Sequence, residues 1–591
     1  EIKSMEDLYH EIREDPLYTR LFELANVHTA EEFGADVPED AYEQMAGAIE
    51  DENDWAEIRG EDWFTAAQAT TDEQNFFHWE LEFPEVFFDS EGEKMSAAGF
   101  DAVVGNPPYI RVQELKNANK EFSEYLIRTF GTTKGRFDIY SCFVESGNEI
   151  AASSNLAYIL PNRFFQSDAG EGLRTYLTSK GKLESILDFH KYQVFQGVTT
   201  YTCILKLNDH PENVTYSKIN SEPNEIEDLY HSTKTTIDKN DLTGDKWALV
   251  DPQAKNVLNK LKQESDTLND ITTDVFEGIV SGDNNIMYPK LVSTGDEYTT
   301  IIHPETNDRV KLESELVPPV IKGDNIKRYD SAEPDLCAIY PYDSDGELIS
   351  ESRLESDFPR VYQYLDSYRE QLANRGTDGM KYQSWYALYR DRERRQFEEK
   401  KVITPDICER CEFSLDETGD VYLDATAYGI IPEENTREMR HYFTAVLNSS
   451  TIWFYISKTS ARIRGGFYRF KTSYLRPVPV PEVSSVDDVD DTDVDDINLK
   501  NHSDEKLAGI VSELAIKNRQ QTVDRNRLNL SLLDYLGNTP EANAIEEVGL
   551  YQPAKQSSKS YLTQTTEQHP NLRVGTARVD RESPNTVLIE A

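Results

Sequence analysis

A short apolar run followed by two consecutive prolines constrains the fold of this chain more than any other feature. Residues 99–105 read Gly-Phe-Asp-Ala-Val-Val-Gly, and Asn106, Pro107, Pro108 and Tyr109 follow directly. A short apolar run bounded by glycine predicts a buried strand. Proline fixes φ and lacks a backbone N–H, so the strand must end here in a stiff loop. Ligands of open α/β sheets bind where the strands end, which makes this loop the first candidate for a functional site.

Strands and helices alternate after this loop, which predicts an α/β sheet layer. We expect helices at residues 140–152 and 171–179, and strands at residues 156–160, 183–189 and 201–207. The last two strands are close in sequence and suggest an antiparallel edge of the sheet. Apolar residues at three-and-four spacing predict helices at residues 7–25 and 38–50.

Shifts in composition divide the chain into six segments. These are an acidic helical insertion or connector (1–75), the α/β layer (76–210), a polar connector (211–267), a second, α+β region (268–482), an Asp-rich linker (483–500), and a helical region with a loose tail (501–591). In the second region we expect strands at residues 275–280, 320–321 and 421–423 and a helix at 439–448. The aspartates of the linker predict a solvated spacer.

The charge of the chain is strongly negative, with 61 Lys and Arg against 108 Asp and Glu and a formal net charge of -47. The excess is spread along the whole chain, so we interpret it as a solvated acidic surface of a halophilic protein. Such a charge would normally exclude nucleic acid as a partner. In molar salt it does not, because repulsion between the acidic protein and nucleic acid is screened within a few ångström. Local patches of charge then decide whether nucleic acid binds.

Cysteine content and hydropathy indicate the compartment. Five cysteines in 591 residues cannot form a disulfide framework, and no apolar run of about 18 residues could span a membrane. We therefore expect a cytoplasmic protein without a membrane partner.

The loop at Asn106 presents an unusual set of acceptors. The side-chain oxygen of Asn106 and the carbonyl of Pro107 can hold both hydrogens of a planar exocyclic amine, and the nitrogen can then direct its lone pair at an electrophile. The ring of Tyr109 can stack on the aromatic base that carries the amine. An ordinary turn after a strand would use the same residue types, so that alternative stays open.

A basic segment interrupts the acidic chain. Residues 457–481 contain no acidic residue but carry arginines and lysines with interleaved aromatics and a Gly-Gly pair, a pattern that suits phosphate contacts. The candidate DNA-binding residues here are Lys458, Arg462, Arg464, Arg469 and Lys471. Alternatively, the segment is a structural strand pair whose basic groups neutralise nearby carboxylates.

Several spaced motifs resemble one family. The stretches are residues 76–88, 100–109, 134–140 (Lys-Gly-Arg-Phe-Asp-Ile-Tyr), 193–197 (Gln-Val-Phe-Gln-Gly), 320–329 and 475–479. Together they resemble the TaqI-like adenine-specific DNA methyltransferases of type II restriction-modification systems, in particular the large fused restriction-methylation proteins. The resemblance covers roughly residues 70–480.

The resemblance implies a fold, a reaction and site residues. The fold is a Rossmann-like methyltransferase domain followed by an α+β target-recognition domain and a C-terminal helical region. The reaction is transfer of a methyl group from S-adenosylmethionine to N6 of adenine in double-stranded DNA. Asn106, Pro107, Pro108 and Tyr109 would be catalytic, and Phe195 with Tyr109 would enclose the extruded base, which compensates its unstacking. Lys322, Lys327 and Arg328 would contact DNA.

The glycine-rich strand-to-helix turn that binds the cofactor in this family is not found before Asn106, and Gly170-Glu171-Gly172 follows the loop and lacks the third glycine. We therefore expect this chain to be the carboxyl-terminal portion of a longer methyltransferase, which needs a missing N-terminal segment or a partner subunit. Alone it should be weakly active or inactive.

Two other functions remain as alternatives. One is methylation of a protein glutamine, because Asn-Pro-Pro-Tyr serves there too, and the other is a non-catalytic DNA-specificity subunit that needs a partner. We expect no metal site, since Cys408 and Cys411 form a single Cys-x-x-Cys without a second pair. His78 and His190 stand in aromatic surroundings and are expected to be packed.

Overall fold

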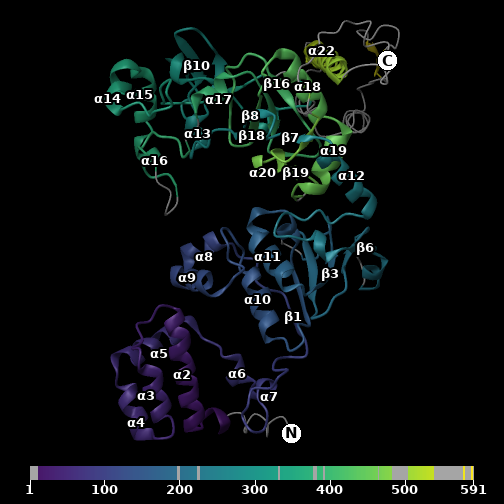
Figure 1. Ribbon diagram of the computed structural model, residues 1–591. Coiled ribbons are helices and arrows are strands. Elements are labelled where there is room, and N and C mark those ends of the chain that lie inside the picture. Colours follow the sequence, from purple (N-terminus) through teal and green to yellow (C-terminus); the bar gives the residue numbers. More distant parts are fainter. Residues whose placement is uncertain are drawn as a thin grey trace, which may run out of the picture. The chain divides into compact units, whose positions relative to one another are not determined.

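The computed structural model describes residues 11–195, 200–222, 226–330, 333–376, 382–390, 393–463, 465–481, 483, 504–537, 577–579 and 587–589. The chain divides into two compact units, one of residues 1–264 with 454–469, the other of residues 265–453 with 470–591 (Figure 1). Each unit is described by itself.

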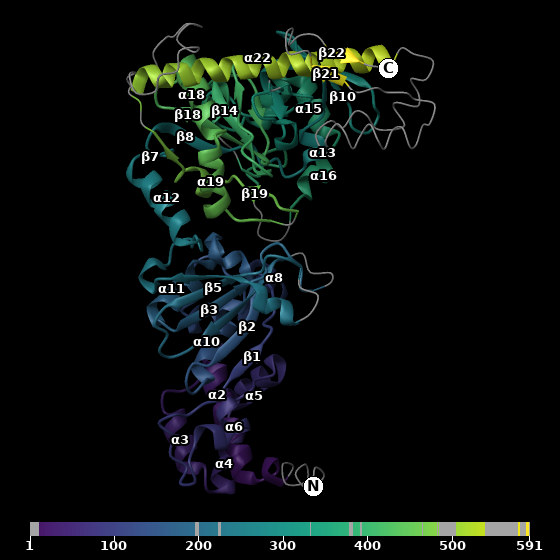
Figure 2. The same ribbon diagram turned by 90° about the vertical axis from the view of Figure 1, so that its right-hand side faces the viewer.

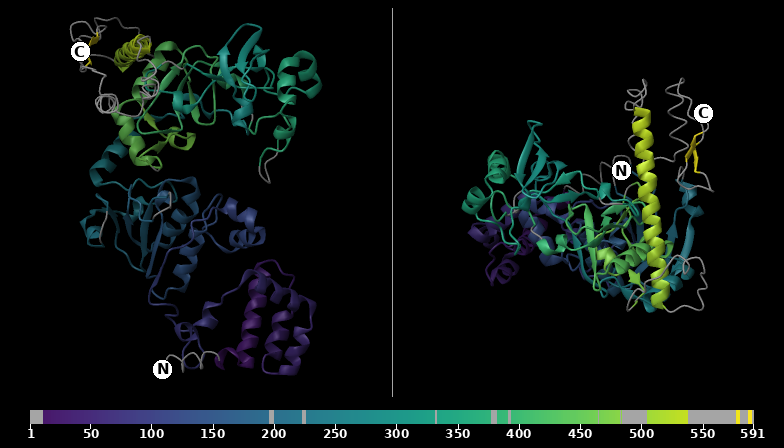
Figure 3. Two further views of the ribbon diagram at one scale, coloured as in Figure 1. Left: turned by 180° about the vertical axis from the view of Figure 1, so that it is seen from behind. Right: turned by 90° about the horizontal axis from the view of Figure 1, so that it is seen from above.

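The first unit begins with a bundle of helices, seen in purple from behind in Figure 3 (left). Its helices are α2 (Pro16–Glu32), α3 (Ala41–Ala48), α4 (Glu52–Arg59) and α5 (Asp62–Gln74). Asp15 and Asp51 cap α2 and α4, because their carboxylates accept hydrogen bonds from the free N–H groups of the first turns. Val27, Met45 and Trp55 are fully buried among these helices. The helix predicted at residues 38–50 is confirmed by α3; that predicted at residues 7–25 overlaps α2, which extends to Glu32, and its residues 7–10 lie outside the described part of the chain.

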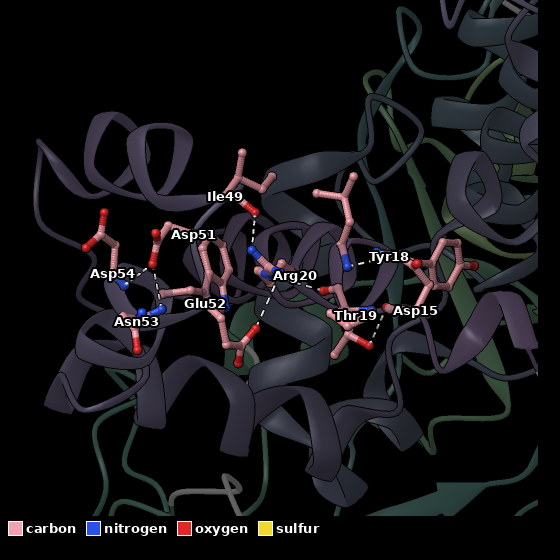
Figure 4. A network of polar contacts seen from close by, with 12 residues as sticks. Asp15, Tyr18, Thr19, Arg20, Ile49, Asp51, Glu52, Asn53 and Asp54 are labelled. Atoms are coloured by element: carbon pink, nitrogen blue, oxygen red, sulfur yellow. Dashed lines mark hydrogen bonds and ion pairs between the residues drawn. The ribbon is translucent and has the colours of Figure 1, made fainter.

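Arg20 joins the helices of the bundle (Figure 4). Its guanidinium donates to the backbone oxygens of Ile49 (2.5 Å) and Pro16 (3.1 Å) and pairs with Glu52 at 3.3 Å. Arg20 itself is buried, so these acceptors compensate its desolvation. One side chain of α2 thereby holds the α3–α4 connection in place.

The aromatic run of residues 76–88 forms two short helices, α6 (Trp79–Glu82) and α7 (Pro84–Phe87). Trp79, Phe83 and Phe87 meet the ring of Phe100 nearly edge-on, with ring centroids 5.3–5.8 Å apart. Aromatic edges favour such contacts. The run therefore fixes the start of the segment that leads to Asn106.

A six-stranded sheet forms the centre of the first unit (Figure 2). Its order is β1-β2-β4-β3-β5-β6, with β1 parallel to β2, β4 antiparallel to both β2 and β3, β3 parallel to β5, and β6 antiparallel to β5. The strands are β1 (Val103–Gly105), β2 (Leu156–Pro161), β3 (Leu183–Asp188), β4 (Thr202–Leu207), β5 (Val214–Lys218) and β6 (Thr233–Ile237).

Helices accompany this sheet and complete its core. They are α8 (Val112–Ala118), α9 (Lys120–Thr129), α10 (Tyr140–Ile150), α11 (Glu171–Lys180) and α12 (Pro252–Gln263), with 3-10 turns η1 (Asn162–Phe165), η2 (Asp168–Gly170), η3 (Ile226–His231) and η4 (Lys239–Asp241). Side chains of α10 and α11 join those of β2, β3 and β4 in one buried cluster. The predicted helices at 140–152 and 171–179 and the three predicted strands are confirmed.

Three sequence-based expectations about this sheet were wrong. The strand before Asn106 is not buried: β1 lies at the edge, and Val104 is 77% exposed, because no described strand pairs with its outer side. The antiparallel pair β3–β4 is interior and not an edge. Residues 211–267, expected as a polar connector, contribute β5 and β6, whose alternating polar residues hide a buried face.

The second unit contains a six-stranded sheet (β11-β10-β9-β13-β12-β17) and a four-stranded sheet (β16-β14-β18-β8) around a large apolar core. The strands are β7 (Asp266–Thr267), β8 (Thr272–Glu277), β9 (Lys290–Ser293), β10 (Tyr298–Ile302), β11 (Arg309–Glu313), β12 (Pro319–Ile321), β13 (Leu336–Cys337), β14 (Lys401–Pro405), β15 (Ile407–Cys408), β16 (Ser414–Asp416), β17 (Tyr422–Leu423), β18 (Ala427–Pro432) and β20 (Pro479–Val480). Strands β7 and β20 pair with each other.

The helices of the second unit lie between and after these strands. They are α13 (Asn284–Met287), α14 (Glu351–Asp357), α15 (Pro359–Asp366), α16 (Arg369–Ala373), α17 (Arg394–Glu398), α18 (Arg437–Leu447), α20 (Thr472–Leu475) and α22 (Asp504–Gly537), with η5 (Ser314–Leu316) and η6 (Gly323–Asn325). Helix α22 is a straight rod (Figure 3, right), and Ser512 donates to the backbone oxygen of Glu438 in α18. Strands β21 (Ala577–Val579) and β22 (Val587–Ile589) form a separate pair.

Helix α19 (Ser450–Thr459) and strand β19 (Tyr468–Arg469) belong to the stretch at which the chain returns to the first unit. The predicted strands and helices of the second region and the predicted C-terminal helix are confirmed as elements. The Asp-rich linker lies almost entirely outside the described residues, as does most of the predicted loose tail.

Candidate functional site

The loop at Asn106 begins at the carboxyl end of β1. Gly105 faces Tyr158 in the parallel neighbour β2, and a Cβ on Gly105 would lie 3.1 Å from the Tyr158 ring. A larger residue would press on this ring, so the close approach favours glycine. Pro107 is buried, whereas Asn106 is exposed, and no hydrogen bond of the Asn106 side chain joins it to another described residue. The amide of Asn106 is thus presented to solvent by a loop that is anchored one residue later.

Tyr109 fastens the other end of the loop. Its hydroxyl donates to the backbone oxygen of Ile159 in β2 (3.2 Å), and its half-buried ring packs against the core of the sheet beside Val103. Burial raises the pKa of Tyr109 to about 12, so the hydroxyl stays protonated and remains a donor. The ring is therefore held from its hydroxyl end.

The motif at residues 134–140 docks directly behind this loop. The N–H of Ile139 donates to Ile110 (2.9 Å), and the N–H of Val112 donates to Phe137 (3.1 Å). Segments 110–112 and 137–139 therefore run side by side in a short antiparallel pairing. The backbone leaving Tyr109 is fixed by residues almost thirty positions further along the chain.

An ion pair secures that motif to β2. Asp138 is 3% exposed, and Arg163 in η1, just after β2, donates to both its oxygens, from Nη2 at 2.5 Å and from Nε at 3.1 Å. A two-point contact of a planar guanidinium with a carboxylate fixes orientation as well as distance. Sequence reasoning included Asp138 in a motif but gave it no role, and it did not single out Arg163.

A second carboxylate organises the neighbouring strand ends. Asp188 at the end of β3 is 5% exposed and accepts three hydrogen bonds, from Asn162 Nδ2 (2.8 Å), the Tyr216 hydroxyl (2.7 Å) and the N–H of His190 (2.8 Å). Strands β1, β2 and β3 run in the same direction. Asn106, Asn162 and Asp188 therefore lie along one edge of the sheet, where ligands of open α/β sheets bind.

Comparison with known proteins assigns both halves of the chain. Residues 18–195 match the Eco57I restriction-modification methylase family, and residues 318–480 match the TaqI-like C-terminal specificity domain. The first of these regions is thus similar to an Eco57I-type methylase, and the second is similar to a TaqI-like specificity domain. The predicted resemblance and the predicted order of a methyltransferase domain and a specificity domain are confirmed.

Two curated relatives illustrate the extent of the similarity. The Type II restriction enzyme and methyltransferase RM.Eco57I of Escherichia coli is 25% identical over 451 residues, which cover 73% of this chain and 44% of that protein. The Type II methyltransferase M.BstVI of Geobacillus stearothermophilus is 24% identical over 71% of this chain and 73% of its own. The chain thus spans less than half the length of RM.Eco57I.

Among solved structures, the Type IIL restriction-modification enzyme MmeI in complex with DNA aligns with a TM-score of 0.45 and 14% identity, over 79% of this chain and 52% of that one. No helix in the described part of the chain is both long and apolar enough to cross a membrane.

The basic segment at residues 457–481 divides between the two units. Lys458, Arg462 and Arg469 belong to the first unit, whereas Lys471 belongs to the second and is exposed. Arg464 lies outside the described residues. The three first-unit residues therefore sit with the methylase sheet, although the sequence places them in the second region.

A hairpin carries the first-unit part of this segment. Residues 462 and 468 pair across a turn at Gly465 and Gly466, both with positive φ, which glycine adopts without strain. The N–H of Gly465 donates to the Tyr201 hydroxyl (3.2 Å) at the start of β4. The predicted alternative of a strand pair thus describes its backbone correctly, but Lys458 and Arg462 form no ion pair with a carboxylate in the described part of the chain.

The three candidate DNA-binding residues in the specificity domain make contacts within that domain. Lys327 pairs with Glu412 at 3.6 Å, and Arg328 donates to the backbone oxygen of Asn448 (2.8 Å). Lys322 is half-buried near Asp424. Two of these three cations therefore have partners inside their own domain.

The remaining predicted residues are placed as follows. Phe195 is half-buried and directly precedes residues 196–199, which are outside the described part together with Gln196 and Gly197 of its motif. His78 is packed as predicted: its Nε2 lies 2.8 Å from Asn26 Oδ1, beside aromatic rings. His190 is half-buried, as expected, but its ring lies among cations.

Cys408 and Cys411 are buried, and burial raises the pKa of the Cys411 thiol to about 12. Among the described residues, no three His, Cys, Asp or Glu side chains gather where they could hold a metal ion.

Proposed function

We propose that this chain is the amine-binding and DNA-reading portion of an adenine-specific DNA methyltransferase, which uses S-adenosylmethionine to methylate N6 of adenine in a specific double-stranded sequence as part of a restriction-modification or related defence system. The observation that carries the proposal is the exposed amide of Asn106 at the carboxyl end of β1, on a loop anchored by Pro107 and Tyr109. The matches to a methylase family and a specificity domain support it.

In this proposal the loop activates the amine in two ways: it fixes the position of the amine, and it directs the dipoles of two oxygen acceptors at the amine hydrogens. The Asn106 side-chain oxygen and the Pro107 carbonyl each accept one amine hydrogen. The nitrogen then becomes pyramidal, and its lone pair leaves the ring system and is free to accept carbon. No carboxylate base is needed beside Asn106. Tyr109 and Phe195 contact the faces of the extruded adenine, which compensates part of the unstacking free energy.

The residues present do not complete a site for the cofactor. Residues 11–102 contain no strand, so they lack the strand-to-glycine turn that would hold a nucleoside. Strand β1 has an open outer edge with the apolar Val104 exposed. We propose that the cofactor turn comes from a segment or subunit outside these 591 residues, and that it pairs with this edge as a further strand.

DNA binding in this proposal involves both units. Lys458, Arg462 and Arg469 contact phosphates near the methylase sheet, Arg464 of the same segment contacts DNA, and Lys322, Lys327, Arg328 and Lys471 contact DNA from the specificity domain. The ion pair of Lys327 with Glu412 would have to open for such a contact. A cytoplasmic location and adaptation to high salt accompany the proposal.

The decisive experiment replaces Asn106 by alanine in the enzyme supplemented with the upstream segment or subunit. Loss of one preorganised acceptor should lower the rate of adenine methylation by about 10²-fold or more, while DNA affinity stays within twofold. Transfer of labelled methyl to DNA measures the rate, and Asn119→Ala, at the N-cap of α9, serves as the control amide. Methylation at the parental rate in the Asn106→Ala enzyme would contradict the proposal.

A second candidate function is that of a DNA-specificity subunit without catalysis. Only one observation, the open edge of β1, favours it. The two functions differ in one measurement: addition of the upstream part should create binding of labelled S-adenosylmethionine and methylation if the first is correct. Methylation of a protein glutamine is disfavoured by the specificity domain at residues 318–480. Transfer of label to protein and not to DNA would reverse that preference.

A further inference from the structure

Five side chains of the first unit form a positively charged group at the end of its sheet, which we call the His190 cluster. It consists of His190 and Lys191 after β3, Lys218 at the end of β5, and Lys458 and Arg462 from the returning segment 454–469. All four cations lie close enough to the His190 ring to lower its pKa. Three segments that are distant in sequence therefore direct positive charge to one place.

His190 is held in a defined orientation at the centre of this cluster. Its backbone has φ of 55°, a left-handed conformation that is unusual for a residue with a side chain, and its N–H donates to Asp188 (2.8 Å). Arg462 Nη1 donates to the ring at Nε2 (2.8 Å). Backbone strain of this kind clusters at active sites and ligand-binding sites.

The imidazole of His190 acts as a neutral acceptor. Burial first, and then the neighbouring cations, lower the pKa of His190 to about 3, so the ring carries no charge near neutral pH. It therefore orients Arg462 without neutralising it. The Nε of Arg462 is buried and has no hydrogen-bond partner within the described part of the chain, which leaves a donor of this guanidinium unused.

No carboxylate balances these charges. Among the described residues, Lys191, Lys218, Lys458 and Arg462 form no ion pair, in a chain with 108 acidic residues. Two carboxylates act on these cations without forming an ion pair, Asp188 on Lys218 and Asp251 on Lys458. Asp188 already accepts hydrogen bonds from Asn162, Tyr216 and the His190 backbone. Burial, and then repulsion by Lys458, lower the pKa of Lys218, although Asp188 opposes this effect. The cluster thus keeps uncompensated positive charge that an anion would stabilise.

The position of the cluster relates it to Asn106. The parallel strands β1 and β3 end at the same edge of the sheet, with β2 and β4 between them in the order β1-β2-β4-β3. Three strand spacings separate β1 from β3, or about 14 Å. A base held at Asn106 and a phosphate one or two nucleotides away in the same strand are separated by a similar distance.

We propose that the His190 cluster binds a backbone phosphate of the DNA strand that carries the methylated adenine, next to the extruded nucleotide, with His190 positioning Arg462. The proposal rests on the proposed function, because that function puts the base at Asn106. It adds Lys191, Lys218 and His190 as binding or positioning residues, and it makes the returning segment a part of the methylase site. Phosphate contacts of this kind fix the register of a strand without reading its sequence.

The test uses Lys218→Gln/Lys458→Gln, which removes two cations with little change of shape. For the 591-residue chain, the slope of log binding constant against log salt should fall by about 0.9, the contribution of one phosphate. The matched control is Lys206→Gln in β4, a lysine paired with Glu184 near the opposite end of β3. Its slope should not change.

A second arm locates the phosphate. In a set of duplexes, single phosphates around the target adenine are replaced by neutral methylphosphonates. Unmodified protein should lose about tenfold affinity at one position on the target strand, and the double variant should lose less than twofold there. His190→Asn should also reduce the loss of affinity at this position, because Arg462 loses the acceptor that orients it.

The outcomes separate this proposal from the proposed function. If the double variant keeps the parental salt slope, or loses affinity equally at every methylphosphonate, the phosphate site is contradicted even when methylation depends on Asn106. If Asn106→Ala methylates normally but the position-specific loss persists, the chemistry at Asn106 is contradicted and the phosphate site stands. A chain that binds no DNA contradicts both.

Discussion

At the scale of single residues, the loop at Asn106 depends on contacts made behind it. The two prolines and Gly105 restrict its backbone, as the sequence predicts, but its position relative to β2 is set by Tyr109 and by the pairing of residues 137–139 with 110–112. Asp138 and Arg163 hold that pairing in place. These two residues are positioning residues for the proposed reaction.

We expect Asp138→Asn to lower the methylation rate of the complete enzyme by about tenfold and to change its DNA affinity little. The asparagine keeps the shape but loses the charge-assisted pair, so the loop moves relative to the base. Arg163→Lys should have a similar effect, since lysine cannot make the two-point contact. Single-turnover rates and DNA binding curves measure both quantities. An unchanged rate with an unstable protein would indicate a purely structural pair.

Two buried histidines make stability depend on pH. Burial, followed by neighbouring cations, lowers the pKa of His190 to about 3 and that of His441 in α18 to about 4, against about 6.5 in the unfolded chain. The unfolded state therefore binds more protons below pH 6.5, and folding stability is lost as the pH falls from 6.5 towards these values.

From pH 6.5 to pH 5, each histidine should reduce the free energy of unfolding by about 2 kcal/mol. Denaturant unfolding at a series of pH values measures the slope for each unit. His441→Gln should flatten the loss in the second unit only, and His190→Asn in the first only. Equal slopes for variants and parent would show that these groups are protonated in the folded chain.

At the scale of elements, the hairpin 462–468 transfers a short piece of the basic segment to the methylase sheet. Gly465 and Gly466 have φ of 89° and 88°, which a residue with a Cβ adopts only with strain. The turn aims Arg462 at His190 and places the Gly465 N–H on the Tyr201 hydroxyl. Backbone conformation and charge placement are therefore coupled in this element.

Replacing Gly465 and Gly466 by alanine should destabilise the hairpin by about 1–2 kcal/mol for each position and weaken DNA binding through Arg462. Hydrogen exchange of the peptide that covers residues 462–468 should become faster. The control is Gly47→Ala in α3, where a Cβ meets no atom within 4 Å. There alanine should stabilise the bundle by up to about 1 kcal/mol. Unchanged exchange in the hairpin would contradict the coupling.

At the scale of the whole molecule, the net charge of -47 dominates the response to salt. Repulsion between exposed carboxylates destabilises the compact state, and added salt screens it. The melting temperature should therefore rise steadily between 0.1 and 2 M potassium chloride. Changing the exposed Glu43, Glu50 and Glu57 to glutamine should raise it at low salt and reduce its salt dependence. A melting temperature that is independent of salt would contradict adaptation to high salt.

The sequence by itself determined those features that depend on neighbouring residues. The resemblance to a known family implied the order of the two domains, whereas proline geometry at Pro107 and Pro108 and apolar periodicity predicted the end of β1 and most helices and strands. Each of these elements results from backbone restriction or local burial within about ten residues. For that reason the candidate loop could be found before the fold was known.

Only the tertiary structure decided what surrounds that loop. The exposed edge of β1, the strands β5 and β6, and the contact between His190 and Arg462, 272 residues apart, depend on which segments pack together. A histidine looks the same in the sequence whether it meets aromatic rings or cations. Its charge state follows from burial and from the sum of nearby charges, which the folded chain alone brings together.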